Sequence, residues 1–174
     1  MGRRGQAQIE FEQEPLEAMT RLPDKLFRIF YKFAYVMMRV FCFVFRPRTR
    51  GVCVAVRFED KVLIIKNSYH HKHTLPGGYV KRGERPRLAA VRELKEEVGL
   101  EIRPEQLSFE LKVPLQIEFK RELMTFFDLK LARLPLITID KREVIGARFV
   151  ALEEALALDL SGPCRLYLKK FQNR

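Results

Sequence analysis

Apolar residues dominate one long segment near the start of the chain, LFRIFYKFAYVMMRVFCFVF, from Leu26 to Phe45. At 100° per residue its basic side chains fall in one narrow sector, and much of the remaining circumference is apolar. The residues of that sector are Arg28, Lys32, Arg39 and Arg46, with Tyr35 among them. The pattern predicts a basic amphipathic helix that ends before Pro47.

Three placements of this helix are open. Its apolar face can pack on its own domain or on a partner subunit. It can instead lie in a membrane interface, with the basic stripe toward anionic headgroups. It is also long enough to span a bilayer, although charges at mid-helix are costly. A cleaved signal peptide is disfavoured because the apolar run starts far from Met1. Residues 1 to about 20 are polar and predict a loose or partly helical leader.

After Pro47 the pattern changes to short runs rich in β-branched and aromatic residues, which predict strands. A helix is predicted between Pro86, which suits a first turn, and Gly99, which suits a C-terminal cap. Its apolar stripe consists of Leu88, Val91, Leu94 and Val98. The strands are expected at 51–58 and 62–66, joined in a hairpin, and at 107–119, 122–134 and 146–152. Two short helices are expected at 153–158 and 163–171.

Composition narrows the class of protein. The 174 residues, 47% of them apolar, fit one globular domain plus an extension, which we divide as 1–47 and 48–174. A net charge of +11 favours anionic partners but does not choose among nucleotides, nucleic acid and membrane surfaces. Three scattered cysteines, Cys42, Cys53 and Cys164, indicate a reducing cytoplasm and buried apolar roles. His70, His71 and His73 lack further ligands at zinc spacing and predict a polar loop.

One acidic cluster stands out in this basic chain, the stretch RELKEEVGL. Glu93, Glu96 and Glu97 stand at i, i+3 and i+4, so a helix places them on one face, where they repel one another. A divalent cation such as Mg²⁺ or Mn²⁺ would remove that cost, because both prefer oxygen ligands. The glutamates alone are equally compatible with a solvated acidic face.

The residues upstream change the balance. Gly78 is followed after five residues by Glu84, and seven residues later by Arg92 and Glu93. The run resembles the Nudix box, G-x5-E-x7-R-E-U-x-E-E-x-G-U with U aliphatic. Every specified position matches: Gly78, Glu84, Arg92, Glu93, Leu94, Glu96, Glu97, Gly99 and Leu100. The resemblance extends from about residue 50 to 174. It implies a Nudix-type α/β/α sandwich with a mixed β-sheet, preceded here by the basic amphipathic helix.

The resemblance also implies roles for residues. Glu93, Glu96 and Glu97 would hold Mg²⁺, with Mn²⁺ as an alternative, helped by the carbonyl of Gly77 or Gly78. Glu96 and Glu97 would thereby also serve catalysis, Arg92 would orient the carboxylates, and Glu84 would anchor the loop that leads into the helix. The resemblance implies a general base that is either a glutamate of the box or one in a later loop. Glu143, six residues before the aromatic Phe149, stands where several family members place it, and an ordinary solvated turn residue is the alternative. Glu118 and Glu122 are weaker rivals.

Specificity lies outside the box. We expect Tyr79 and Arg82 to contact substrate, with a core position as the alternative for Tyr79 and a solvated charge as the alternative for Arg82. Other aromatic residues either stack a base or belong to the core: Tyr69, Phe109, Phe119, Phe126 and Phe127.

The predicted function is Mg²⁺-dependent hydrolysis of a nucleoside diphosphate linked to another moiety, with water attacking phosphorus. The alternative is a catalytically weak ligand sensor or membrane-docked adaptor that acts through the N-terminal helix. The expected partners are a nucleotide-type diphosphate, an anionic membrane surface and a second copy of the chain, but not nucleic acid. The expected location is the cytoplasm, peripheral to the membrane if the helix binds lipid.

Overall fold

The computed structural model describes residues 22–117, 119–139 and 141–172, without the side chains of residues 22–25 and 28. The predicted leader, Arg28 in the basic sector and the rival base Glu118 therefore lie outside the described side chains. The elements are α1 (Leu22–Phe45), β1 (Arg48–Phe58), β2 (Lys61–Asn67), β3 (His73–Thr74), β4 (Gly77–Tyr79), α2 (Pro86–Val98), a 3-10 turn (Pro104–Gln106), β5 (Ser108–Ile117), β6 (Lys120–Leu131), β7 (Val144–Ala151), α3 (Leu152–Ala157) and α4 (Gly162–Gln172).

A mixed sheet forms the centre of the domain. Its main path runs β3-β2-β1-β6-β5, with β4 paired to β1 and β7 paired to β2. Only the β1–β6 pair is parallel among the described strands, in register from Arg48↔Arg121 to Phe58↔Leu131. The predicted β1–β2 hairpin is confirmed by the pairs Arg57↔Val62 and Phe58↔Lys61.

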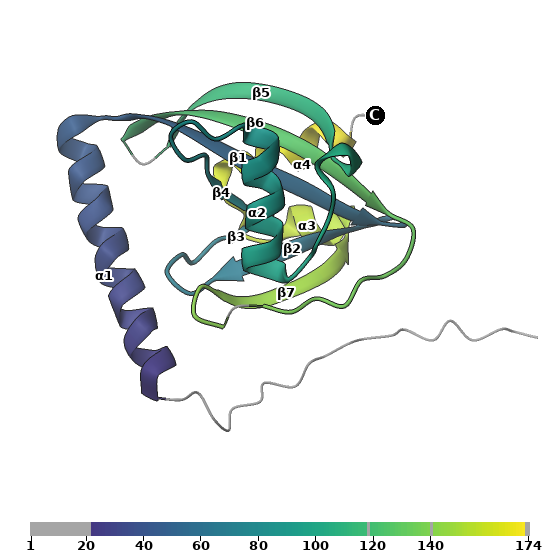
Figure 1. The fold of residues 1–174 in the computed structure, drawn as a ribbon, viewed down its shortest axis with the longest axis horizontal. Helices are drawn as coiled ribbons and strands as arrows, with labels where there is room; N and C mark the ends of the chain where they lie inside the picture. Colours follow the sequence, from purple (N-terminus) through teal and green to yellow (C-terminus); the bar gives the residue numbers. More distant parts are fainter. Residues whose placement is uncertain (1–21, 118, 140, 173–174) are drawn as a thin grey trace, which may run out of the picture.

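Helices cover both faces of this sheet (Figure 1). On one face, α2 buries Ala90, Leu94 and Val98 against side chains of β1, β2 and β6. On the other, α3 and α4 bury a second cluster in which Tyr167 stacks on Phe126 at 4.9 Å. Alternating side chains of the same strands supply both clusters, because successive residues point to opposite faces. The predicted α/β/α sandwich is confirmed.

Two details of the sequence prediction are wrong. Leu88 does not belong to the buried stripe of α2, since it is 47% exposed, and Ala89 and Ala90 are buried instead. The buried side of α2 is therefore rotated relative to the predicted stripe, and it includes Glu97. The strand expected at 122–134 is displaced, because β6 runs from Lys120 to Leu131. The three cysteines are buried, as predicted.

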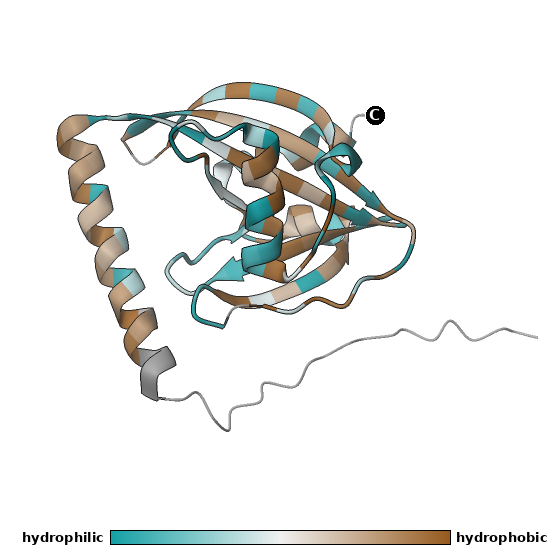
Figure 2. Ribbon diagram, viewed as in Figure 1, coloured by the Kyte–Doolittle hydropathy of each residue, from teal (hydrophilic) through white to brown (hydrophobic). Residues whose placement is uncertain are grey.

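Helix α1 lies beside the domain and is apolar over much of its length (Figures 1 and 2). It contacts the domain through a stripe that contains Tyr31, Tyr35 and Met38. Its wide apolar face does not pack on its own domain, since large apolar side chains there are exposed: Ile29, Phe33, Val36, Val40 and Val44. Among the described residues, we find no helix long and apolar enough to cross a membrane.

Candidate active site

Two adjacent glycines bring the backbone of β4 against its neighbours. A Cβ on Gly77, whose φ is +153°, would lie 2.1 Å from the carbonyl oxygen of Val52 in β1. A Cβ on Gly78 would lie 2.6 Å from Glu93 Oε1. The backbone contact excludes a side chain at Gly77, and a side chain at Gly78 would displace the Glu93 carboxylate from its position.

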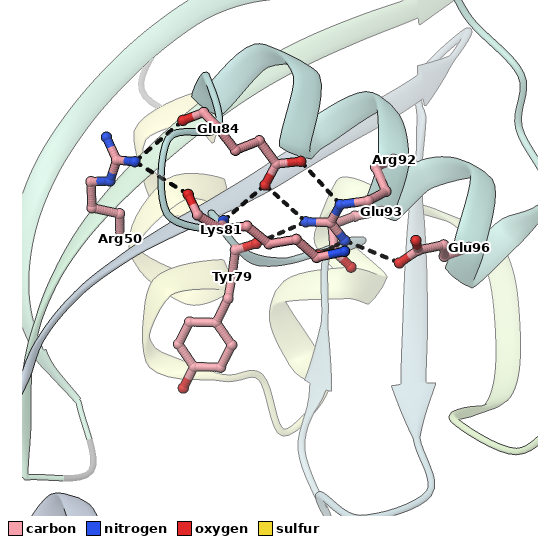
Figure 3. A network of polar contacts seen from close by, with 7 residues as sticks. All are labelled: Arg50, Tyr79, Lys81, Glu84, Arg92, Glu93 and Glu96. Carbon is pink, nitrogen blue, oxygen red and sulfur yellow. Dashed lines mark hydrogen bonds and ion pairs between the residues drawn. The ribbon is translucent and has the colours of Figure 1, made fainter.

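Arg92 is the centre of a polar network at this end of α2 (Figure 3). Its Nη1 donates to Glu93 Oε1 at 2.6 Å and to Glu96 Oε2 at 3.0 Å. Its Nε and Nη2 donate to the two carboxylate oxygens of Glu84 at 3.1 and 3.2 Å, and Nη2 also donates to the carbonyl of Tyr79 at 2.9 Å. The planar guanidinium thus ties three carboxylates and the preceding loop together.

Glu84 holds the loop between β4 and α2. Its Oε2 accepts a hydrogen bond from the backbone N–H of Lys81 at 2.8 Å, and Arg50 from β1 donates to its carbonyl at 3.2 Å (Figure 3). The hydrogen bonds from Arg92 lower the pKa of Glu84, against a smaller opposing effect of burial. Glu84 is therefore charged near neutral pH, and its role here is structural.

Glu97 lies apart from that network. It is 3% exposed, and its Oε2 accepts a hydrogen bond from the backbone N–H of Gly77 at 2.7 Å. Burial raises the pKa of Glu97 well above its usual range, and nearby Glu93 and Glu143 raise it further. Burial also raises the pKa of Glu93 despite the opposing contact with Arg92. The buried Glu97 and the half-buried Glu93, both with raised pKa values, are groups that a cation would stabilise in their charged form.

The carboxylates are close, yet they are not gathered around one point. Within the described residues, no group of three or more His, Cys, Asp or Glu side chains is arranged to hold a metal ion. The bonds of Arg92 explain this, because they direct Glu93 and Glu96 toward the guanidinium while Glu97 points to Gly77. The donor chemistry still fits a divalent cation, since Glu93 and Glu97 are oxygen donors that adjoin the two glycines.

Glu143 is joined to the same region by a chain of hydrogen bonds. The Tyr69 hydroxyl donates to Glu143 Oε1 at 3.3 Å and accepts from Asn67 Nδ2 at 2.9 Å. Asn67 also lowers the pKa of Glu97, against the larger opposing effect of burial. The predicted base is thus hydrogen-bonded to Tyr69, and Asn67 influences a predicted metal ligand, which the sequence did not indicate.

A pocket opens beside the glycines. Gly77 and Gly78 form part of its wall, together with Asn67, Tyr69 and Tyr79. Two charged residues of β6 also line it, Lys120 and Glu122, which are 5% exposed each and form an ion pair at 3.3 Å. Helix α1 closes the outer side with Tyr35 and Met38.

Sequence reasoning missed several of these pocket residues. Lys120 and Glu122 had no distinctive signal, because Arg121, Asp128 and Lys130 also lie in β6. Tyr35 and Met38 had no local signal. Of the predicted substrate contacts, Tyr79 lines the pocket, whereas Arg82 is exposed on the loop and is not among the lining residues. Phe126 and Phe127 belong to the core.

Comparison with known proteins identifies the family. The family model of the NUDIX domain matches residues 46–170. The chain therefore belongs to the Nudix family, and the predicted class of enzyme, a Nudix-type pyrophosphohydrolase, is confirmed. No protein among the curated ones matches the chain.

Solved structures share the fold at low identity. A Caenorhabditis elegans Ap4A hydrolase is 22% identical, with a TM-score of 0.61 over 72% of this chain and 96% of its own. An Escherichia coli dihydroneopterin triphosphate pyrophosphohydrolase is 24% identical, with a TM-score of 0.63 over 72% and 96%. A bifunctional NMN adenylyltransferase/ADP ribose pyrophosphatase from Francisella tularensis, complexed with AMP and a Mn ion, is 16% identical, with a TM-score of 0.65 over 82% and 47%.

Proposed function

We propose that this chain hydrolyses a nucleoside diphosphate linked to another moiety, in a reaction that requires Mg²⁺. The observation that carries the proposal is the position of Glu97. It is a buried carboxylate held by the N–H of Gly77, with Glu93 beside Gly78, and the pocket is lined in part by the same two glycines. Acidic side chains that contact the glycines of a pocket wall, in a basic chain, are suited to bind a cation together with a diphosphate.

The residues that would hold Mg²⁺, or Mn²⁺ in its place, are Glu93, Glu96 and Glu97 with the carbonyl of Gly77. The bound cation supplies charge neutralisation for the diphosphate and lowers the pKa of a bound water. Arg92 keeps Glu93 and Glu96 within reach while Glu84 fixes the guanidinium from the other side. Gly78 keeps space free for the diphosphate next to Glu93, because a Cβ there would contact that carboxylate.

Glu143 is proposed as the general base that takes a proton from the attacking water. It is half-buried, and its negative charge contributes to raising the pKa values of Glu93 and Glu97. The bond from Tyr69 fixes the orientation of its carboxylate. Glu122 remains the rival, and its ion pair with Lys120 within the pocket makes it better suited to contact substrate than to accept a proton.

Substrate is proposed to lie with its diphosphate at the glutamates and its remaining groups in the pocket. Tyr79 would contact it there. Arg82 would contact only a substrate group that extends out over the loop, because its side chain is exposed and does not line the pocket.

The test is a panel of diphosphate compounds with and without Mg²⁺, including ADP-ribose, diadenosine tetraphosphate and nucleoside triphosphates. We expect nucleotide release from at least one of them only in the presence of the metal, and its loss in Glu97→Gln. The matched control is Glu101→Gln, which removes the same charge at an exposed position paired with Lys95. Tight binding of a ligand without release across the panel would support the sensor instead.

We also propose that α1 binds an anionic membrane surface reversibly. Its outward face exposes Ile29, Phe33, Val36, Val40 and Val44, and basic side chains border that face at Lys32 and Arg39. An apolar face bordered by cations matches an interface of acyl chains and anionic headgroups, where each nearby Lys or Arg contributes about 1 kcal/mol.

Vesicle co-sedimentation of the full chain tests this second proposal. We expect sedimentation with vesicles of phosphatidylcholine and phosphatidylserine, little with phosphatidylcholine alone, and loss in the double variant Val36→Asp, Val40→Asp. The other predicted occupant is a second copy of the chain. A dimer that the double variant dissociates, with no vesicle binding, would favour that homodimer and reject the membrane.

A further inference from the structure

The side of α1 that meets the domain is not its most apolar side. Tyr31, Tyr35, Met38 and Cys42 follow one another at three- and four-residue intervals, so they form one stripe along the helix. Cys42, a member of this stripe, is buried at 4% exposure, whereas Phe33 on the opposite side of the helix is 64% exposed. A helix that served only to cover the domain would bury its widest apolar face. This helix instead turns a stripe with two tyrosines toward the substrate pocket.

The stripe meets aromatic residues at the pocket mouth. The Tyr35 ring lies 5.5 Å from the ring of Tyr69 and 6.0 Å from that of His70, measured between centroids. The Tyr31 ring stacks on Tyr69 at 6.3 Å. One turn further along, the Tyr79 hydroxyl donates to Met38 Sδ at 3.7 Å. The contacts join α1 to the loop after β2 and to β4, which both flank the pocket.

Tyr35 and Met38 are themselves part of the pocket lining. The same lining includes a donor and an acceptor on β6, Lys120 and Glu122, together with Gly77 and Gly78. A substrate whose diphosphate lies at the glutamates beside these glycines would therefore place its attached group in the pocket that α1 helps to line. Aromatic faces together with a buried donor and acceptor are what a nucleobase requires, because it combines a flat apolar surface with a polar edge.

We propose that α1 is a wall of the substrate pocket, and that Tyr35 and Met38 are specificity-determining residues that contact a nucleobase of the substrate. The inference rests on the proposed function for the position of the diphosphate. Tyr35 stacks on the base or closes over it, Met38 fills the apolar space beside Tyr79, and the β6 pair meets the edge of the base.

The binding test needs no turnover. The chain has no tryptophan, so Tyr35→Trp and Phe33→Trp each introduce the only one, facing the pocket in the first variant and facing outward in the second. The probes are AMP, GMP, CMP and UMP with Mg²⁺, and ribose 5-phosphate, which has the sugar and phosphate without a base. We expect at least one nucleotide to change the emission of the first variant saturably, ribose 5-phosphate to change neither, and the second variant to be unaffected.

No change in Tyr35→Trp with any of the four nucleotides, or an equal change in Phe33→Trp, would overturn the proposal. The kinetic arm uses whichever diphosphate the wild-type chain hydrolyses. Tyr35→Ala should raise KM about 5- to 150-fold with little change in kcat, as expected for loss of one stacking contact, and Phe33→Ala should change neither. An unchanged KM in Tyr35→Ala would reject the proposal that α1 is a wall of the substrate pocket. Failure of the wild type to hydrolyse any diphosphate would reject the proposed function alone, since the emission of Tyr35→Trp still reports base binding.

Discussion

Helices α2 and α1 form an instructive pair. α1 is the longer and more apolar of the two, with 24 residues against 13, yet α2 is the helix of the core. α2 buries Leu94 and Val98 completely, and α1 exposes Phe33, Val36 and Val40. The difference shows that the apolar content of a helix does not determine whether it stabilises the domain. What matters is whether a sheet face is available for it to cover.

The largest expected effect is on the free energy of unfolding, and it differs between α2 and α1. Leu94→Ala should lower the free energy of unfolding by about 2–5 kcal/mol, because it leaves a cavity between α2 and the sheet. Phe33→Ala in α1 should change it by less than about 0.5 kcal/mol, because the side chain is exposed. Denaturant unfolding followed by circular dichroism measures both. A large loss of stability in Phe33→Ala would mean that the outward face of α1 is packed in solution.

The second prediction concerns the acidic end of α2. Burial raises the pKa values of Glu93 and Glu97, so ionising either carboxyl group costs the folded state free energy. Without Mg²⁺, stability should therefore increase as the pH falls through these raised pKa values toward the ordinary range of a carboxyl group. Mg²⁺ at 100 times its Kd should stabilise the fold by about 2.7 kcal/mol near neutral pH, and by less in mild acid, where protons compete for the carboxylates.

Thermal unfolding with and without Mg²⁺, at about pH 7.5 and about pH 5.5, tests this expectation. Glu97→Gln should reduce both the Mg²⁺ effect and the gain in acid, and Glu101→Gln should reduce neither. Equal stabilisation by Mg²⁺ at the two pH values in the wild type would contradict the link between the buried carboxylates and the metal.

The smallest effect is expected at Tyr69, which contacts both α1 and Glu143. Tyr69 packs against α1 with its ring and bonds Glu143 with its hydroxyl, so Tyr69→Phe keeps the packing and removes only the bond. Loss of one such hydrogen bond is worth about 1 kcal/mol, and kcat should fall roughly 5- to 10-fold with KM nearly unchanged. Steady-state kinetics measure the two separately, and Tyr69→Leu, which also removes the ring, should raise KM as well. A kcat in Tyr69→Phe equal to that of the wild type would argue against Glu143 as the base.

Several of the sequence predictions concern local spacing and held for that reason. The α2 boundaries follow from Pro86 and Gly99, and Arg92 reaches Glu96 because residues four apart share a helix face. The two hydrogen bonds between Glu84 and Arg92 were not predicted, since the resemblance implied only that Glu84 anchors the loop and that Arg92 orients the carboxylates. The division of the chain at residue 47 and the catalytic roles of the site residues stay predictions.

The remaining features depend on segments far apart in the chain. Leu88 is exposed and Glu97 is buried, the reverse of what the apolar stripe predicted. The rotation of α2 about its axis is set by the sheet beneath it, and the spacing of residues within the helix does not determine that rotation. Lys120 and Glu122 become pocket residues only when β6 lies parallel to β1. The spacing of polar and apolar residues determined the helices, most strands and the acidic cluster, because those depend on neighbours within a few residues. Only the tertiary structure decided that α1 turns its tyrosines to the pocket and its apolar face outward, because that choice depends on Tyr69 and Tyr79, which the fold places beside α1.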